Sequence, residues 1–391
     1  MGRGESWLAA WGGILFSLLS GKVPGKYVGA VIRRIGSPLP LSQEDLRFEL
    51  GFRRTGRKLV SGRREEDNPD IVSGTYNGYT TGSPVTVMVR NSDPQPLLYR
   101  DVSHLPRPGH ADLSFIKKYG RENWDYVGGG RSSARETLSR VIGGAVAKKL
   151  LMLAGTQVAA YLKSIGGRGD NDAVTFSEAM GSKRFPTRAR NSEWDAEFSE
   201  IISRLFSEGD SAGGIVEVQS SGVLPGMGDP VFWKIKSALA SAIMSMPAAT
   251  GFEYGLGFRS AAMKGSEASD SIVRDSSGDL RTERNLSGGI LGGITTGQDI
   301  VVRCAFKPTS SIRKPAKTVD LDTMEPGSIS VIGRHDPVVA VRGVAVAEAM
   351  VALVLADFYL YEGILPSSRI SRAAAAEMEE KWKVYMKEYA Q

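Results

Sequence analysis

Histidine is the side chain that most readily donates or accepts a proton near neutral pH, and this chain has three: His104, His110 and His335. His110 lies in the segment Arg-Pro-Gly-His-Ala-Asp (107–112). His335 lies in Gly-Arg-His-Asp-Pro (333–337), which places a guanidinium, an imidazole and a carboxylate side by side. A lone histidine beside a proline turn is usually structural, so spacing alone makes these segments candidates for acid–base chemistry and does not establish it.

A second kind of segment carries groups that bind anions. Residues 128–137 (Gly-Gly-Gly-Arg-Ser-Ser-Ala-Arg-Glu-Thr) begin with three glycines, which let the backbone come close to a ligand. Ser133 followed three residues later by Glu136 is a capping box and predicts that a helix begins there. The unpaired amides of that helix start, flanked by Arg131 and Arg135, predict an anion cradle, although such turns often serve only packing.

Three further loops have a composition suited to binding a phosphate, a carboxylate or a flat ring. Residues 285–294 are rich in glycine and would let the backbone approach a flat ring or a phosphate. Residues 307–312 offer Lys307 and three hydroxyl groups, which are good donors to a phosphate. Residues 53–58 (Arg-Arg-Thr-Gly-Arg-Lys) carry guanidinium groups that bind phosphate and carboxylate through paired hydrogen bonds; a solvated basic loop is the alternative.

Helices and strands must hold these loops in place. Apolar and small residues recur every three or four positions from Ser133 to about Leu153, which predicts a helix with one buried face, and the pair Gly143-Gly144 allows another element to pack closely on it. The other elements that we expect are helices at 193–208, 233–245, 338–360 and 371–389 and strands at 71–74, 80–84, 85–89 and 215–218.

Composition predicts which of these segments are buried and which are exposed. The 338–360 helix is largely apolar, which predicts burial in the core or at a subunit contact. The 371–389 helix is rich in alanine and charge, which indicates a surface helix. Residues 166–192 are polar and basic with scattered glycine, and we expect a surface insertion there.

Charge and cysteine content narrow the class of protein. The formal charge is +6, and the first 66 residues hold 12 Lys and Arg against 6 Asp and Glu, so the rest of the chain is close to neutral. No segment resembles a nucleic-acid-binding module, so we expect no nucleic acid partner. Cys304 stands alone in an apolar run, which argues against disulfides and a thiolate metal site and fits a reducing cytoplasm.

The apolar run 7–19 has the outline of a secretion signal but is too short to span a bilayer; a buried first strand is the alternative.

Taken in order along the chain, these segments resemble signature segments of the chorismate synthase family. The resemblance covers about residues 25–360, and the segments that carry it most clearly are 107–112, 128–137, 247–253, 307–312 and 333–337. It implies an α+β fold with a helical layer between two antiparallel β-sheets, assembled as a homotetramer. It also divides the chain into a divergent N-terminal segment of the same domain (1–62), the family core (63–360) and a C-terminal helical extension (361–391).

The resemblance implies an enzyme and its chemistry. Chorismate synthases are carbon–oxygen lyases that eliminate phosphate and a ring proton from 5-enolpyruvylshikimate 3-phosphate to give chorismate, in the shikimate pathway that leads to aromatic amino acids. They require reduced FMN although the reaction has no net redox change, and NADPH is a candidate reductant for that flavin. We expect a cytoplasmic enzyme with no metal site and no membrane partner.

Residue by residue, the family motifs imply the following roles. His110 is expected to donate a proton, and Asp336 to help the flavin nitrogen accept the ring proton. The residues implied for flavin binding are Arg131, Ser132, Ser133, Ala248, Gly292, Lys307, Pro308, Thr309, Ser310, Ser311 and Arg334. The residues implied for substrate or NADP binding are Arg53, Arg107 and Lys58, with Arg57 as the alternative to Lys58.

The N-terminal segment departs from the family. Chorismate synthases begin with a strand ending in Gly-Glu-Ser-His-Gly, whose histidine is thought to act on the reduced flavin. Residues 4–7 (Gly-Glu-Ser-Trp) resemble this motif, whereas the register of 25–32 puts residues 21–25 (Gly-Lys-Val-Pro-Gly) in its place; neither stretch has the histidine. Two explanations stay open. One is a real divergence, which predicts a catalytically impaired FMN- or anion-binding homologue, and the other is a reading-frame error in the source sequence.

Overall fold

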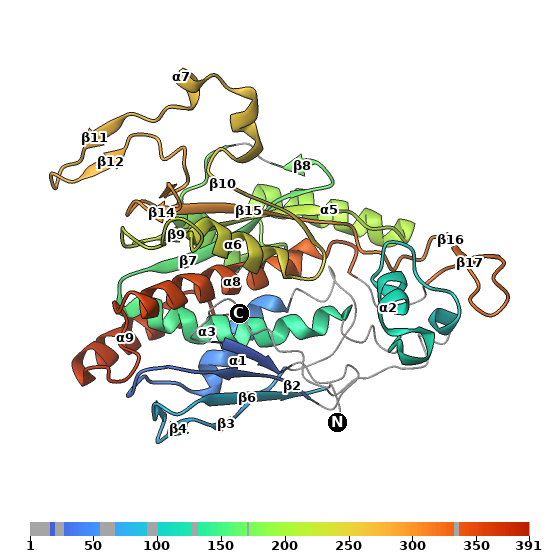
Figure 1. The fold of residues 1–391 in the computed structure, drawn as a ribbon, viewed down its shortest axis with the longest axis horizontal. Coiled ribbons are helices and arrows are strands. Elements are labelled where there is room, and N and C mark those ends of the chain that lie inside the picture. The colour runs from blue at the N-terminus through green and yellow to red at the C-terminus, as the bar shows by residue number, and fades with distance from the viewer. Residues whose placement is uncertain are drawn as a thin grey trace.

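The computed structural model describes residues 16–19, 27–54, 67–91, 101–126, 132–169, 172–331 and 336–390. This part of the chain combines long helices with antiparallel sheets, so the expected mixture of helix and sheet is confirmed (Figure 1). The boundary expected near residue 62 falls outside the described residues.

Two sheets carry most of the strands, and every strand pair in them is antiparallel. The first has the strand order β1 (Phe16–Leu19), β2 (Tyr27–Ile32), β6 (Val85–Arg90), β3 (Pro69–Ser73). The second has the order β10 (Ala249–Tyr254), β15 (Ile300–Phe306), β9 (Gly214–Ser221), β7 (Gln157–Ile165), β8 (Arg168–Gly169). Small hairpins are β4 (Thr75–Tyr76) with β5 (Tyr79–Thr80), β11 (Ile272–Arg274) with β12 (Leu280–Thr282), β13 (Ile290–Leu291) with β14 (Ile294–Thr295), and β16 (Ala316–Val319) with β17 (Pro326–Ile329).

Strand β1 takes up the last four residues of the apolar run 7–19 and pairs with β2. The expectation of a first strand therefore holds for those four positions. In the second sheet, β15 buries every second residue from Ile300 to Phe306, so one face of this strand faces the core.

The helices of the described chain are α1 (Gln43–Arg53), α2 (Asp112–Tyr119), α3 (Thr137–Leu153), α4 (Phe176–Gly181), α5 (Ser192–Glu208), α6 (Ile235–Met244), α7 (Gly265–Ala268), α8 (Ala340–Tyr361) and α9 (Arg372–Glu388). Helices α3 and α8 pack on each other and lie between the two sheets in Figure 1, with α3 against β2 and α8 against β7 and β9. The close approach of α3 and α8 depends on Gly144, since a Cβ there would lie 2.3 Å from the Cβ of Ala349. The packing role expected for the glycine pair is confirmed.

Helix α8 is buried along nearly its whole length, which confirms the core placement expected for 338–360. Of the helices that the structure describes, it is the one long and apolar enough to cross a membrane by length and composition, a property that a buried core helix shares. Helix α9 lies against α3 and buries Met378, Trp382 and Tyr385, so it is a surface helix with one fully buried face.

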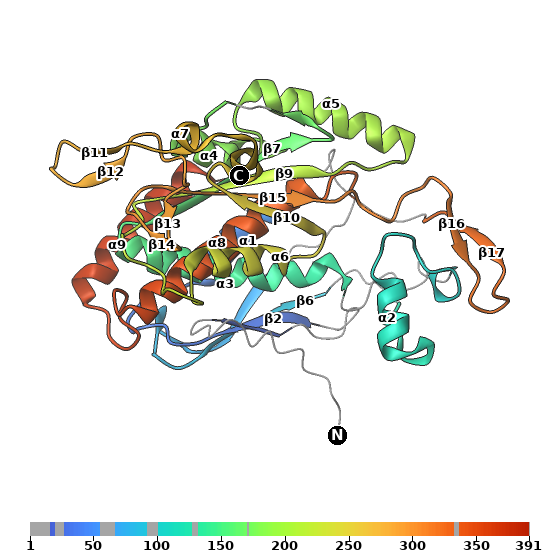
Figure 2. The same ribbon diagram turned by 45° about the horizontal axis from the view of Figure 1, so that its top comes forward.

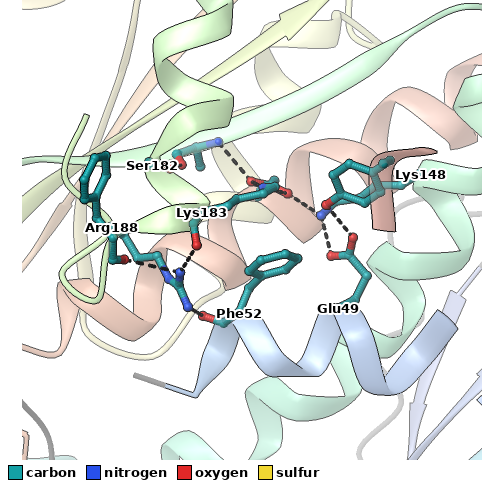
Figure 3. A network of polar contacts seen from close by, with 10 residues as sticks. Glu49, Phe52, Lys148, Ser182, Lys183 and Arg188 are labelled. Atoms are coloured by element: carbon teal, nitrogen blue, oxygen red, sulfur yellow. Dashed lines mark hydrogen bonds and ion pairs between the residues drawn. The ribbon is translucent and has the colours of Figure 1, made fainter. Parts of the chain in front are cut away.

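The expectation of a surface insertion at 166–192 is wrong for its second half. Residues 176–181 form α4, and Ser182, Lys183, Thr187 and Arg188 are buried. Polar composition suggested exposure, but here the charged groups find partners in the core, as Figure 3 shows.

Candidate active site

The turn before α2 holds a buried ion pair next to His110. The Arg107 guanidinium binds the Asp112 carboxylate bidentately, with Nε donating to Oδ2 at 2.8 Å and Nη2 to Oδ1 at 2.9 Å. The backbone N–H of Arg107 also donates to Oδ2. Both side chains are nearly inaccessible to solvent. Burial alone raises the pKa of Asp112, but hydrogen bonds and charges from His110 and Arg107 outweigh it and hold that pKa well below its usual range. Asp112 is therefore an ionised carboxylate at neutral pH.

His110 is oriented by that carboxylate. Its Nδ1 lies 2.6 Å from Asp112 Oδ1, while Arg107 Nη2 lies 3.0 Å from the same nitrogen. One nitrogen cannot donate and accept together, and Nδ1–H donating to an ionised carboxylate gives the shorter and stronger bond, so we assign the proton to Nδ1. The imidazole side chain keeps 18 % of its surface exposed, which leaves Nε2 as its outward-facing nitrogen.

The loop that follows β15 lies against the His110 turn. Lys307 Nζ and Ser310 Oγ both donate to the carbonyl of Gly109, the latter at 2.7 Å. Arg107 Nη1 donates to Ser311 Oγ at 3.3 Å. Two segments about 200 positions apart in the sequence are therefore joined at the end of β15.

Neighbouring segments extend this cluster. The backbone N–H of Lys307 donates to the carbonyl of Ala248, a half-buried residue whose positive φ of 65° is uncommon for a side chain with Cβ. Thr309 Oγ1 donates to the Asp336 carbonyl at 2.7 Å, and the Asp336 carboxylate lies 2.9 Å from Arg342 Nε. Both views show α2 beside the β16–β17 hairpin at the same end of the molecule (Figure 2), where Thr318 Oγ1 donates to the Pro106 carbonyl.

A small pocket shares Ser311 and Asp336 with this cluster and is otherwise lined by Leu205, Phe206, residues 209–211, residues 312–313, Val331 and Pro337. Its volume is about 40 Å³. That is space for a few water molecules, whereas sites for ligands with several rings measure roughly 300–1,000 Å³, so this pocket is not a ring-binding site.

The predicted anion cradle is described from Ser132 onward. A short 3₁₀ turn, Ala134–Glu136, precedes α3, and Ser133 caps it by accepting from the Arg135 N–H at 3.4 Å. The reciprocal half of the capping box is wrong: the Glu136 carboxylate binds Arg140 Nε at 3.0 Å instead. Arg140 also donates to Ser245 Oγ, so Glu136, which local spacing assigned to the cap, is instead part of a tertiary contact.

Arg135 does not flank the cradle as expected. Its guanidinium binds Asp67 and donates to Asn91 Oδ1 at 2.9 Å, and the side chain is 3 % exposed. Arg53 approaches the same turn from α1, with Nε donating to Thr137 Oγ1 and Nη2 to the Ala134 carbonyl, both at 3.1 Å. Arg53 thus holds a backbone carbonyl of the turn, and Arg135 attaches the turn to Asp67 and Asn91.

Comparisons with known proteins identify the family of this chain. The family model described as chorismate synthase matches residues 16–360. A chorismate synthase of Sulfolobus acidocaldarius is 55 % identical over 368 residues, covering 94 % of each chain. One of Sulfurisphaera tokodaii is 54 % identical over 376 residues, covering 96 % of each chain. The chain belongs to the chorismate synthase family. A crystal structure of a chorismate synthase is similar, with a TM-score of 0.72, 30 % sequence identity and coverage of 95 % of this chain and 99 % of that one. Membership makes the chain a carbon–oxygen lyase of the shikimate pathway.

The residues expected from the chorismate synthase motifs fall into three groups. His110, Ala248 and 307–311 are brought together, with Asp336 beside them. Gly292 lies near the start of α6, because the Ile235 N–H donates to the Gly293 carbonyl, whereas Ala248 follows the end of this helix, which is about 15 Å long; the role expected for Gly292 stays a prediction. Lys58, Arg131 and Arg334 lie outside the described residues.

Two arginines expected at the chorismate synthase substrate are engaged with the protein itself. Arg107 and Arg53 are 4 % and 5 % exposed, and their guanidinium groups bind Asp112 and the start of α3 respectively. Positioning is the role that these contacts support, and a direct contact with substrate stays a prediction.

Sequence reasoning missed two partners. Asp112 is part of the 107–112 motif, but no role was predicted for it; the His-x-Asp spacing at 110 and 112 could have indicated a carboxylate that orients His110. Arg342, which binds Asp336, had no local signal because it lies inside the apolar helix α8. Among the described residues, no group of three or more His, Cys, Asp and Glu side chains could hold a metal ion.

Proposed function

We propose that this chain converts 5-enolpyruvylshikimate 3-phosphate to chorismate by anti-1,4-elimination of phosphate, with reduced FMN as its cofactor. Family membership supports the reaction class. The observation that carries the proposal to particular residues is the contact between the His110–Asp112 pair and the Lys307–Ser311 loop, because it joins a proton donor to a phosphate-binding donor set.

The donor set fits a flavin phosphate. The Lys307 ammonium has three N–H groups, of which the Gly109 carbonyl takes one, so two can face an anion. The hydroxyls of Ser311 and Ser133 accept from Arg107 and from the Arg135 N–H, so each keeps its hydrogen to donate to an anion, whereas Thr309 and Ser310 donate theirs to the Asp336 and Gly109 carbonyls. Pro308 fixes the backbone of this loop, and we assign Ser132 to the flavin on family resemblance. A bound reduced flavin supplies transient electron density that helps expel the phosphate.

His110 acts as the proton donor in this proposal. Asp112 stabilises the protonated imidazole by a charge-assisted hydrogen bond to Nδ1, so the proton to be given away is the one on Nε2. Arg107 holds Asp112 in place and makes no proton transfer itself. The imidazole can then pass its proton to an anion that develops at the edge of the cluster.

The other expected residues are assigned as follows. We assign to Asp336, which pairs with Arg342, the role of assisting proton acceptance by the flavin, on family resemblance. We assign Arg131, Arg334, Ala248 and Gly292 to flavin binding, and Arg53, Arg107 and Lys58 to the substrate or NADP side, on family resemblance. On the same ground we infer NADPH as a flavin reductant, a cytoplasmic homotetramer with no nucleic acid or membrane partner, and the family's sandwich of helices between two sheets for the whole chain.

A second function has one specific observation in its favour. The first histidine of the chain is His104, so neither N-terminal register supplies the family's first histidine. This favours a catalytically impaired homologue that binds FMN or anions without turnover.

One experiment separates the two functions. Phosphate release is measured anaerobically with reduced FMN and the substrate, and FMN binding is measured by fluorescence quenching. The measurements are repeated after Lys22→Glu, Val23→Ser and Pro24→His, which restore Gly-Glu-Ser-His-Gly at residues 21–25. Turnover by the unchanged chain supports the enzyme, and FMN binding with turnover only after restoration supports the impaired homologue. Failure to bind FMN in either form refutes both.

A further inference from the structure

A network of buried charges occupies the middle of the helical layer (Figure 3). The Glu348 carboxylate on α8 accepts from Lys148 on α3, from Lys183 at 2.6 and 2.7 Å, and from the Ala160 N–H at 2.9 Å. Lys148 also binds Glu49 of α1 at 2.5 Å. Burial raises the pKa of Glu348, but the two lysines outweigh it and lower that pKa, so the carboxylate stays ionised.

Arg188 lies next to this network and is 3 % exposed. Its Nη1 donates to the carbonyls of Lys183 at 2.7 Å and Phe185 at 3.3 Å. Its Nη2 donates to the carbonyls of Phe52 at 3.1 Å and Arg54 at 3.3 Å. A planar guanidinium suits such divergent acceptors, which the ammonium of a lysine cannot span at once.

The backbone of Arg188 is held in an unusual conformation to make these contacts. Its φ is 64°, in the left-handed region that residues other than glycine rarely adopt. Burial lowers the pKa of this guanidinium to about 10, so it remains charged at neutral pH. A strained backbone that carries a buried cation indicates that the surroundings specify this position.

Two of the four acceptors of Arg188 are at the end of α1. The last carbonyls of any helix lack partners within the helix, and α1 ends at Arg53 and Arg54 without a glycine to close it. Arg188 supplies donors to Phe52 and Arg54, the residues on either side of Arg53, and its charge complements the negative end of the helix dipole.

Arg53 connects this helix end to the turn at the start of α3. Its guanidinium donates to Thr137 Oγ1 and to the Ala134 carbonyl, and Nη1 lies 3.7 Å from Asp67. Because the carbonyls on both sides of Arg53 are held by Arg188, the direction of the Arg53 side chain depends on that contact. The turn 132–137 includes Ser132 and Ser133, which we assigned to flavin binding.

We propose that Arg188 is a positioning residue for the cofactor: it fixes the end of α1, which aims Arg53 and thereby sets the turn 132–137. This inference rests on the proposed function only in taking FMN as the ligand of that turn. A residue with a merely structural role would reduce the amount of folded protein and leave the affinity of the folded fraction unchanged.

The test compares Arg188→Lys with Lys149→Met in the full chain. Lys149 is also buried and binds Asp45, at the start of α1, and Glu379 of α9, so it is a matched control for the loss of contacts made by a buried cation. We expect Arg188→Lys to raise the dissociation constant for FMN, measured by fluorescence quenching, by about fivefold or more. The apparent KM for reduced FMN should rise in parallel while kcat stays within about threefold. Lys149→Met should leave the dissociation constant and KM unchanged.

A double-mutant cycle tests the route through Arg53. If Arg188 acts through Arg53, then Arg188→Lys adds nothing to the FMN dissociation constant of an Arg53→Lys chain; additive effects overturn the proposal. Hydrogen exchange gives a readout without ligand: Arg188→Lys should speed exchange by about tenfold or more in peptides from the end of α1 and from 134–140, and Lys149→Met should not.

The outcomes separate the two proposals. Faster exchange at both peptides in a chain that does not bind FMN counts against the proposed function and supports the structural link. Normal FMN binding and turnover with unchanged exchange and affinity in Arg188→Lys refutes the Arg188 role alone.

Discussion

Replacing Asp112 by asparagine probes the centre of the candidate site. The change keeps the size of the side chain and one acceptor oxygen but removes the charge that faces Arg107 and His110. Removing one partner of a buried ion pair costs about 3–5 kcal/mol, and because the amide oxygen keeps part of the bonding we expect a loss near 3 kcal/mol in the free energy of unfolding.

The variant should also lose activity in the fraction that remains folded. An amide does not hold the Nδ1 proton of His110 as a carboxylate does, so the imidazole loses both its orientation and its stabilised charge. Positioned acid–base groups contribute about 10²–10⁴ in rate, and we expect kcat to fall about 100-fold or more.

The assays are phosphate release with reduced FMN under anaerobic conditions and urea unfolding. Asp322→Asn is a matched control, because Asp322 also pairs with an arginine, Arg121, but its side chain is 62 % exposed. Such a surface pair contributes about 0–1 kcal/mol, and the control should keep its kcat. If Asp112→Asn retains kcat within about threefold of the parent while it remains folded, the assignment of His110 and Asp112 is wrong.

The same variant has a signature in the pH dependence of stability. The pKa of Asp112 in the folded chain is lower than in the unfolded chain, so its stabilising contribution is complete above about pH 4 and is lost as the pH falls further. We therefore expect the unfolding free energy of the parent to decline more steeply between about pH 4 and pH 2 than that of Asp112→Asn. Equal slopes in the two proteins would contradict this account.

Three further outcomes follow from buried positions elsewhere. Gly144→Ala should lose about 1–3 kcal/mol in urea unfolding because its Cβ meets Ala349, whereas Gly181→Ala at the end of α4, with no atom within 4 Å, should lose nothing; equal effects would refute the packing argument. Glu348→Gln should lose about 3 kcal/mol or more, because two buried lysines lose their shared carboxylate, and a loss below about 1 kcal/mol would contradict this. Burial raises the pKa of Cys304 to about 12, so a thiol reagent such as Ellman's should react with it only after unfolding, and rapid reaction with the native chain would count against its core placement.

Local signals in the sequence were reliable where the structure is decided locally. The helix expected at 193–208 is α5, which ends at Gly209 with φ of 68°, because glycine enters the left-handed region without penalty. The apolar spacing of 133–153 predicted α3, and the glycine pair within it predicted the close contact with α8. The start, end and buried face of each of these helices depend on neighbouring residues, whereas the partner of Gly144 comes from a distant helix.

Signals that depend on competition between partners were only half right. Ser133 caps the turn before α3 as expected, but Glu136 binds Arg140 rather than completing the capping box. Arg135, expected beside a ligand, turns inward to Asp67. The spacing of these residues permits either the local contact or the tertiary contact, and the structure contains the tertiary contact because its free energy is more favourable.

The sequence by itself determined the family, the reaction class and the long helices α3, α5, α6, α8 and α9, because motifs and apolar periodicity are contained in short stretches of chain. Only the tertiary structure brought His110 to Lys307, and only it turned the polar stretch around Lys183 and Arg188 into core. A charged side chain is buried when an opposite charge or a carbonyl group meets it there, and those partners come from α1 and α8, more than 130 positions away in the chain.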